Sequence, residues 1–460
     1  MSSGTWVAMV LAVTWGCGEV KPITDDGNLG DGPTELPLPP TGVTACRQAG
    51  SNRIYWPSVP GAATYHVYAS TSAGVTAGST RVGFDVRSPF THGSLDNDTQ
   101  YFYRISAVNE LGESMDLSNE VTATPRAYTL PTNALFAATN TANGNTGAIY
   151  MWDDWTVSPS TIPDRFLEDA PANATTQLLQ PRTGSLFVDR LGALLYVTNA
   201  GGTGAGRRVT VYDNVATIDG AVSPVRVLQD GDLGNLRGIY VDTTRNLLYV
   251  ANRLPGSIVI YDDACNVTGS PPPAPRAVIS GDATGLDGLG QISLDEERDM
   301  LYIANSTDVR VYSNASSLVG PIATPPDRTL ALRDEAANVI NLEAYGVSID
   351  STTDMLYVTH RGTTVSPPAN PVSSIFVVHN ASAANGSVVV SRTITTLSAS
   401  FELPMTVHVA NNRVFASNDV GAENTMNSWD NASTVVGPAS ALDTPASPYM
   451  FNFTSVFYVP

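Results

Sequence analysis

Five polar side chains stand at a similar distance before five short strand-like segments, and their types could bind a cation. They are Arg182, Asn235, Asp287, Glu343 and Glu402. Carboxylate and amide oxygens are the ligands that a hard cation such as calcium prefers. The alternative is that these residues only make exposed loops polar, as most loops are. The elements that carry the five residues therefore decide what they can do.

Those elements recur along the chain, which is the pattern of a repeat protein. A degenerate first copy, ALFAATN, begins at Ala134. The copies that follow are LLYVTN (194–199), LLYVAN (247–252), MLYIAN (300–305), MLYVTH (355–360) and RVFASN (413–418). Each has the alternation of a short buried strand rather than the period of a helix.

Each repeat predicts four strands, which is the content of one β-propeller blade. One strand precedes the motif, as in GIYVD (238–242), and another follows it, as in SIVIYDD (257–263). A fourth begins beside an arginine, at Arg165, Arg226, Arg276, Arg328 and Arg392. Because a single blade cannot bury both faces of its sheet, the blades must stack into a closed ring.

Residues 133–460 divide into six such units, with seven blades as the alternative. The first copy lacks an innermost strand, and the C-terminal segment MFNFTSVFYVP can supply it. The repeats resemble the NHL and YVTN-type propeller families, a resemblance that implies fold far more than function. Propellers usually present ligands at one mouth of the central channel, and we expect the five polar residues to converge there.

Other recurring polar residues are interpreted as structural. Aspartates end the inner strands at a hairpin turn, where Asp bonds its own backbone; they are Asp189, Asp242, Asp295 and Asp350. Asparagines end the second strands and are expected to cap turns; they are Asn199, Asn252, Asn305 and Asn418, with His360 in the same place in one blade.

Residues 38–126 show short strands that alternate with period two, which suits a β-sandwich. Trp56, the pair Tyr65 and Tyr68, and the segment YFYRISAVN (101–109) resemble a fibronectin type III domain. That resemblance implies a spacer or adhesion unit. The predicted fold class is therefore all-β, a fibronectin type III sandwich followed by a propeller.

The N-terminus resembles a lipoprotein signal peptide over residues 1–17. The apolar run WVAMVLAVTW (6–15) is too short for a lasting transmembrane helix and ends at Gly16-Cys17. The resemblance implies lipidation of Cys17, with plain secretory cleavage as the alternative. Residues 18–37 predict a disordered tether. The expected location is extracytoplasmic, at the outer membrane or cell surface if the cell is Gram-negative, with secretion as the alternative.

Composition excludes some partners. The 460 residues carry a formal charge of −19 and only 24 basic side chains, with no basic cluster. Nucleic acid is therefore excluded as a partner, and contact with a membrane is expected only through the lipid anchor. Three cysteines are too few for a disulfide scaffold. Cys46 and Cys265 are predicted to be isolated thiols; the alternatives are a bridge between the two domains or a metal role.

Standard catalytic motifs are absent, which favours a non-catalytic binding or scaffold protein with a protein or glycan partner at the cell envelope. One alternative is a calcium-dependent, lactonase-like hydrolase acting at the channel mouth. Another is a glycan-binding protein that uses exposed Trp152, Trp155 and Trp429, although packing is expected for the first and third. Of the five histidines, only His360, His379 and His408 are expected to approach one another; the others are His66 and His92.

Overall fold

The computed structural model describes the chain in segments. They are residues 33–140, 147–155, 162–168, 178, 183–199, 207–229, 233–271, 273–334, 337, 339–340, 344–360, 374–396, 404–418, 426–439, 442–443 and 451–460. The proposed signal peptide and most of the proposed tether lie outside them. Within these segments the regular structure is β, apart from two single 3₁₀ turns, η2 (Asp282–Thr284) and η3 (Ala315–Ser317). The described part of the chain holds no helix with the length and apolar character that a membrane crossing needs.

The first domain is a two-sheet sandwich. One sheet has the order β1 (Thr44–Gln48), β2 (Ser51–Tyr55), β5 (Phe90–His92). The other has the order β4 (Thr80–Val86), β3 (Thr64–Ser70), β6 (Tyr101–Asn109), β7 (Gly112–Glu113), with β8 (Val121–Ala123) also paired to β6. Trp56 and Tyr65 meet edge to face in the core at 5.4 Å. The Asp96 amide donates to the Tyr101 hydroxyl, as expected of a tyrosine corner.

The last residues of the predicted tether lie against this sandwich. The Asn109 side chain of β6 donates to the Glu35 carbonyl at 2.8 Å. Disorder of the tether stays a prediction.

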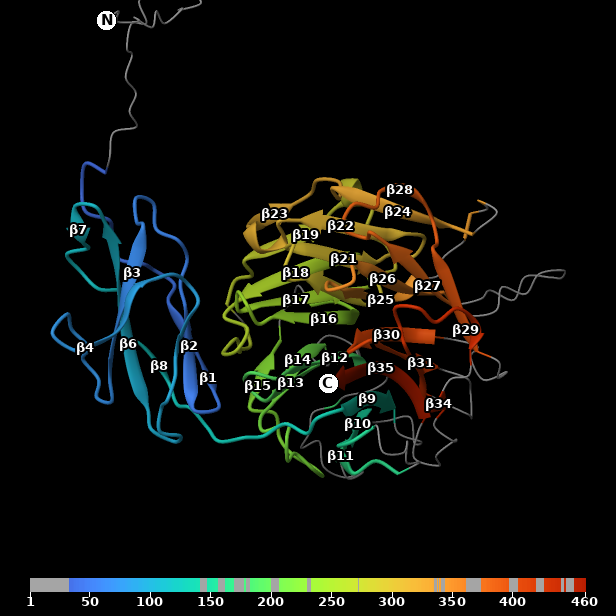
Figure 1. Cartoon of the computed structure of the whole chain (residues 1–460), viewed down its shortest axis with the longest axis horizontal. Helices are drawn as coiled ribbons and strands as arrows, with labels where there is room; N and C mark the ends of the chain where they lie inside the picture. Colours follow the sequence, from blue (N-terminus) through green and yellow to red (C-terminus); the bar gives the residue numbers. More distant parts are fainter. Residues whose placement is uncertain are drawn as a thin grey trace, which may run out of the picture.

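Six sheets follow, one for each repeat within the described residues (Figure 1). The first blade contains β9 (Ala134–Asn140), β10 (Gly147–Trp152), β11 (Arg165–Glu168) and the C-terminal β35 (Phe451–Val459). The second contains β12 (Thr183–Asp189), β13 (Leu194–Asn199), β14 (Arg208–Tyr212) and β15 (Arg226–Leu228). The third contains β16 (Leu236–Asp242), β17 (Leu247–Asn252), β18 (Ser257–Asp262) and β19 (Ala277–Ser280).

The remaining three blades repeat this order. The fourth contains β20 (Ile292–Asp295), β21 (Met300–Ala304), β22 (Val309–Ser313) and β24 (Arg328–Arg333). The fifth contains β25 (Ala344–Asp350), β26 (Met355–His360), β27 (Ser374–His379) and β29 (Arg392–Thr396). The sixth contains β30 (Pro404–Ala410), β31 (Arg413–Asn418), β32 (Met426–Asp430) and β34 (Leu442–Asp443).

The ring closes through the C-terminal strand. β35 pairs antiparallel with β9, placing Tyr458 opposite Leu135 and Val456 opposite Ala137. The innermost strands pack beside one another in the order β35, β12, β16, β20, β25, β30 and back to β35. The predicted closing strand is confirmed, and it supplies a partner that β9 would otherwise lack.

Adjacent blades are also joined at their outer edges, which the repeat analysis did not anticipate. Short strands between the third and fourth strands of a blade pair in parallel with the outer strand of the preceding blade. They are β23 (Gly320–Ile322) on β19, β28 (Gly386–Val389) on β24, and β33 (Gly437–Ala439) on β29. The outer edges of the third, fourth and fifth blades are thereby covered.

The recurring arginine at the start of the outer strand makes the same junction. Arg328 Nη1 donates to the Ala381 and Ala384 carbonyls of the next blade at 3.0 and 2.7 Å. Arg392 Nη1 likewise donates to the Val435 carbonyl at 2.6 Å. The sequence did not predict a role for these arginines. In the structure they join adjacent blades through hydrogen bonds. Hydrogen bonds from a charged donor are stronger than those from a neutral one, so each arginine strengthens the junction.

Candidate functional site

Asn235 and Asp287 occupy equivalent places in the third and fourth blades, just before the innermost strand. The Asn235 carbonyl accepts from the Arg253 amide at 2.7 Å, and the Asp287 carbonyl accepts from the Ser306 amide at 3.1 Å. Both residues therefore lie at one end of the channel, which we call the loop mouth. Asp287 is exposed and Asn235 half-buried.

The loops of these two blades are in contact at the loop mouth. A side chain at Gly256 would meet the Leu286 carbonyl oxygen at 2.1 Å, so only glycine allows this approach. Nearby, Arg253 stacks over the Tyr345 ring at 5.1 Å and donates to its hydroxyl at 3.3 Å. Arg253 and Tyr345 were not predicted as residues of the loop mouth, because no repeated residue type marks either position.

The other three predicted mouth residues, Arg182, Glu343 and Glu402, lie outside the described residues. Within the described chain, no group of three His, Cys, Asp or Glu side chains able to share a metal ion forms at this mouth. The calcium site therefore stays a prediction.

Aromatic side chains of the innermost strands pack against one another between neighbouring blades. Phe187 lies 4.9 Å from Tyr240 and 5.1 Å from Phe457, measured between ring centroids. His408 stacks on Phe457 at 4.3 Å, and its Nε2 lies 3.1 Å from the Tyr458 carbonyl oxygen. Desolvation lowers the pKa of His408 to about 4, so the imidazole is neutral at physiological pH.

A second layer holds the inner strands together through hydrogen bonds. Gln291 Oε1 accepts from the Val347 and Val407 amides, each at 3.2 Å, and so joins three blades. Ser293 Oγ accepts from the Ile349 amide at 3.1 Å. These residues serve packing, and no reacting group among them is aimed at an open cavity.

The aspartates that end the inner strands are structural, as predicted. Asp242 Oδ1 accepts from the Thr244 and Arg245 amides at 2.9 and 2.8 Å. Asp295 and Asp350 accept backbone amides in the same way. We call this end of the ring, opposite the loop mouth, the hairpin face.

The strand-ending asparagines also hold loops. Asn252 Oδ1 accepts from the Gly234 amide at 2.9 Å, and Asn305 Oδ1 accepts from the Asp287 amide at 2.8 Å. Asn199 Nδ2 donates to Thr210 at 3.0 Å. The side chains of Asn418 and His360 lie outside the described set, so their predicted capping role stays a prediction.

Trp152, Trp155 and Trp429 are each 2% exposed, so none of them offers a glycan-binding surface, and the packing expected of Trp152 and Trp429 is confirmed. Trp152 and Trp155 pack between the first and last blades, whereas Trp429 packs between the fifth and sixth.

His379 and His408 do not form a pair. His408 lies on the inner strand β30 and stacks on Phe457, whereas His379 is exposed at the end of β27, where its Nε2 accepts from Arg392. The reason is the four-strand register, which separates inner from third strands.

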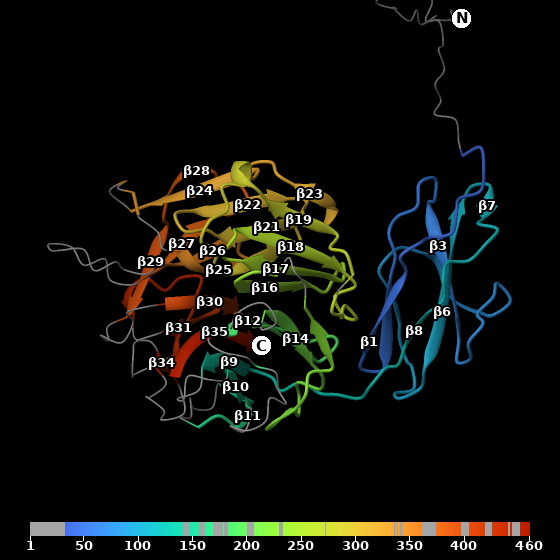
Figure 2. The same cartoon turned by 180° about the vertical axis from the view of Figure 1, so that it is seen from behind.

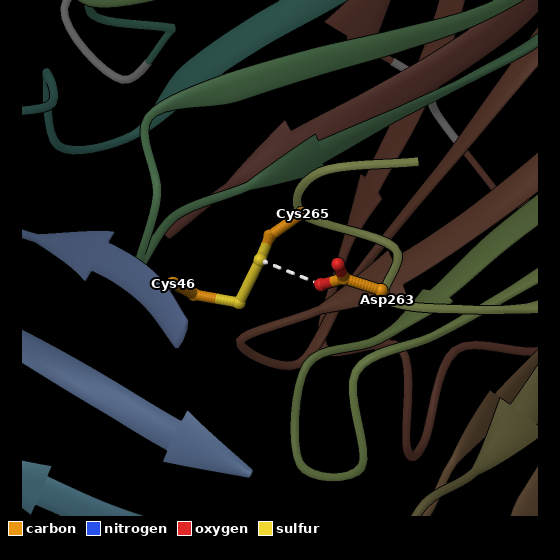
Figure 3. A group of neighbouring side chains, drawn as sticks. All are labelled: Cys46, Asp263 and Cys265. Atoms are coloured by element: carbon orange, nitrogen blue, oxygen red, sulfur yellow. Dashed lines mark hydrogen bonds between the residues drawn. A yellow bond between two sulfur atoms is a disulfide. The ribbon is translucent and has the colours of Figure 1, made fainter. Parts of the chain in front are cut away.

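The predicted isolated thiols are instead a disulfide between the two domains. Cys46 in β1 and Cys265 after β18 are bonded, with 5.9 Å between their Cα atoms. Figure 3 shows the bond beside Asp263, whose Oδ1 lies 3.5 Å from the Cys265 sulfur. These three residues could be mistaken for a metal site, but bonded sulfurs are not thiolates.

The repeat position of Cys265 contains a sequence signal for this disulfide. In the fourth, fifth and sixth blades the residue at this place is a serine whose amide donates to the turn before the second strand, namely Ser316, Ser382 and Ser433. Cys265 makes the same bond to Asn246 at 2.9 Å. Aligning the repeats would therefore have shown a cysteine replacing serine in one blade alone.

Further contacts fix the sandwich on the hairpin face of the second and third blades. The Tyr55 hydroxyl donates to the Thr243 carbonyl at 2.8 Å, and Asn266 Nδ2 donates to the Ala45 carbonyl at 3.2 Å. Asp213 forms ion pairs with Arg47 and Arg126. Figures 1 and 2 show β1 and β2 on the side of the sandwich that faces the propeller.

Burial at this junction shifts the pKa values of two side chains. Burial, followed by the nearby Asp189 charge, raises the pKa of Tyr128 to about 12. Burial likewise raises the pKa of Asp189, although the Gly192 and Leu191 amides oppose that rise. The junction is therefore closely packed around Tyr128 and Asp189.

No family model and no curated protein sequence matches the chain. Among solved structures, a fibronectin type III-like protein from Clostridium thermocellum is 26% identical, covering 21% of this chain and 99% of that one, with a TM-score of 0.18. A candidate 6-phosphogluconolactonase from Bacteroides uniformis is 11% identical, covering 72% and 100%, with a TM-score of 0.39. The dihydro-heme d1 dehydrogenase NirN is 12% identical, covering 73% and 77%, with a TM-score of 0.38.

Proposed function

We propose that this protein is a non-catalytic binding or scaffold protein of the bacterial cell envelope, of the NHL/YVTN-like propeller type. Its partner, a protein or a glycan, binds at the loop mouth. The main support for this proposal is the position of the fibronectin type III domain on the hairpin face. The Cys46–Cys265 disulfide and the hydrogen bond from Tyr55 to Thr243 hold it there. The loop mouth is the opposite end of the ring.

The chemistry of the described residues supports binding over catalysis. The recurring carboxylates of the hairpin face accept backbone amides, and the channel histidine packs on Phe457. At the loop mouth, the Asp287 carboxylate is exposed and its backbone is already paired, so the side chain is available to a partner. Exposed polar groups on a rigid scaffold are the usual basis of recognition.

Export is supported by the disulfide, because such bonds persist in oxidising compartments and are rare in the cytosol. Lipidation of Cys17 would then hold the protein at the membrane, with the ring displayed outside the cytoplasm. Labelling with a radioactive fatty acid that disappears in Cys17→Ser would support the anchor; unchanged labelling would contradict it.

The binding proposal is tested by site-specific crosslinking in the intact cell. A photoreactive benzoyl-phenylalanine placed at Asp287 is expected to yield a discrete adduct. The matched control is the same group at Arg190, which is exposed in the hairpin between β12 and β13 on the opposite face. Equal adducts from both positions, or none from position 287, would contradict binding at the loop mouth.

A further inference from the structure

A cleft lies between the two domains, on the far side of the ring from the loop mouth. Its volume is about 670 Å³, within the usual range for small-molecule sites, which favour domain interfaces. The sandwich contributes one wall and the third blade the other. Cys46–Cys265 lies in the same interface and holds the two walls together.

The sandwich wall is largely apolar. Pro57 and Pro89 line it beside the buried aromatic residues Tyr55, Trp56 and Tyr65. Proline rings are rigid and lose little conformational entropy on binding. This wall therefore favours a ligand with an apolar body.

One cation at the cleft is available within the described residues. Arg87 is exposed at the rim and makes no hydrogen bond or ion pair with the described part of the chain. A guanidinium donates two parallel hydrogen bonds to a carboxylate, so an anionic ligand suits this position.

The lining is locally cationic although the chain carries −19. Three arginines, Arg87, Arg245 and Arg276, line the cleft against two aspartates, Asp262 and Asp263. Arg276 is paired with Asp262 at 2.9 Å, and Asp263 accepts from two asparagine side chains. Arg245 pairs with Asp242 at 3.0 Å, which leaves Arg87 as the cation available to a ligand.

We propose that this interdomain cleft binds a small carboxylate with an apolar body. The apolar body packs against Pro57 and Pro89, and the carboxylate accepts hydrogen bonds from Arg87. This site is independent of the loop mouth, so failure of one proposal leaves the other standing.

The test uses naphthalene-2-carboxylate and its neutral analogue naphthalene-2-carboxamide as probes of the full-length protein. Saturation-transfer NMR titrations are expected to show tighter binding of the carboxylate, by about fivefold, the size of a partly exposed ion pair. Arg87→Ala is expected to abolish this preference. Arg190→Ala, which removes an exposed arginine outside the cleft, is the matched control and should leave it intact.

A second variant separates the wall from the charge. Trp56 and Tyr65 belong to the core of the sandwich, so neither is changed. Pro89→Gly instead removes one apolar ring from the wall. Weaker binding of both probes is expected, with their ratio unchanged. Equal affinity of carboxylate and carboxamide in the native protein, absence of binding by either probe, or an unchanged preference in Arg87→Ala would overturn the proposal.

Discussion

At the residue scale, most side chains that could do chemistry are committed to structure. Asp242 accepts two amides of its own turn and pairs with Arg245. The sequence predicted this role, because an Asp at a strand end recurs in four repeats. It did not predict the exception at Cys265, since one cysteine among repeated serines is visible only after the repeats are aligned.

Glu296 is the residue whose titration should be visible in the stability of the protein. Burial, followed by the adjacent Asp242 charge, raises its pKa to about 7. Its carboxylate oxygens accept from the Thr244 and Tyr240 hydroxyls at 2.6 and 3.2 Å, and Arg245 binds its carbonyl at 3.1 Å. These hydroxyl donors favour the carboxylate, but burial outweighs them and shifts Glu296 toward the neutral acid.

A raised folded-state pKa means that the contribution of Glu296 is complete below about pH 4.5 and is lost as pH rises through 7. Between pH 5 and 8 the native protein should lose roughly 2 kcal/mol of unfolding free energy from this group. Glu296→Gln should remove that part of the pH dependence in urea titrations. The exposed neighbour supplies the control, Glu297→Gln, and an identical profile in all three proteins would refute the assignment.

At the element scale, the repeats predicted the blades well because each strand carries its own local pattern. The closing strand β35 followed from counting: one innermost strand was missing at one end and one strand was left over at the other. The parallel strands β23, β28 and β33 escaped prediction, since each is short and pairs with the preceding blade rather than its own.

The inter-blade arginines make a prediction at this scale. Arg328→Gln should lower the free energy of unfolding by about 1–3 kcal/mol, because it strips charged donors from the Ala381 and Ala384 carbonyls. Arg333→Gln is the comparison: the same strand bears it, but its Nη1 reaches only the Ala337 carbonyl four residues away. Chemical denaturation measures the free energy of unfolding of both variants. Equal losses in the two variants would contradict a specific role of Arg328 between blades.

At the scale of the whole molecule, sequence patterns identified two domains but not their contact. Local patterns cannot encode which face of the ring meets the sandwich, since Cys46 and Cys265 are separated by 219 residues. The candidate site was predicted in part. Asn235 and Asp287 lie at equivalent places on one mouth, whereas Arg253 and Tyr345 came only from the structure.

The fixed position of the sandwich on the propeller is the central claim. The sandwich covers part of the hairpin face, and the interdomain cleft lies between the two domains. The decisive measurement is peptide mapping of the full-length protein by mass spectrometry, after alkylation without reductant. We predict a single linked species joining the Cys46 and Cys265 peptides, which separates on reduction. Recovery of both cysteines as alkylated thiols would contradict the clamped arrangement and the two binding proposals that assume it.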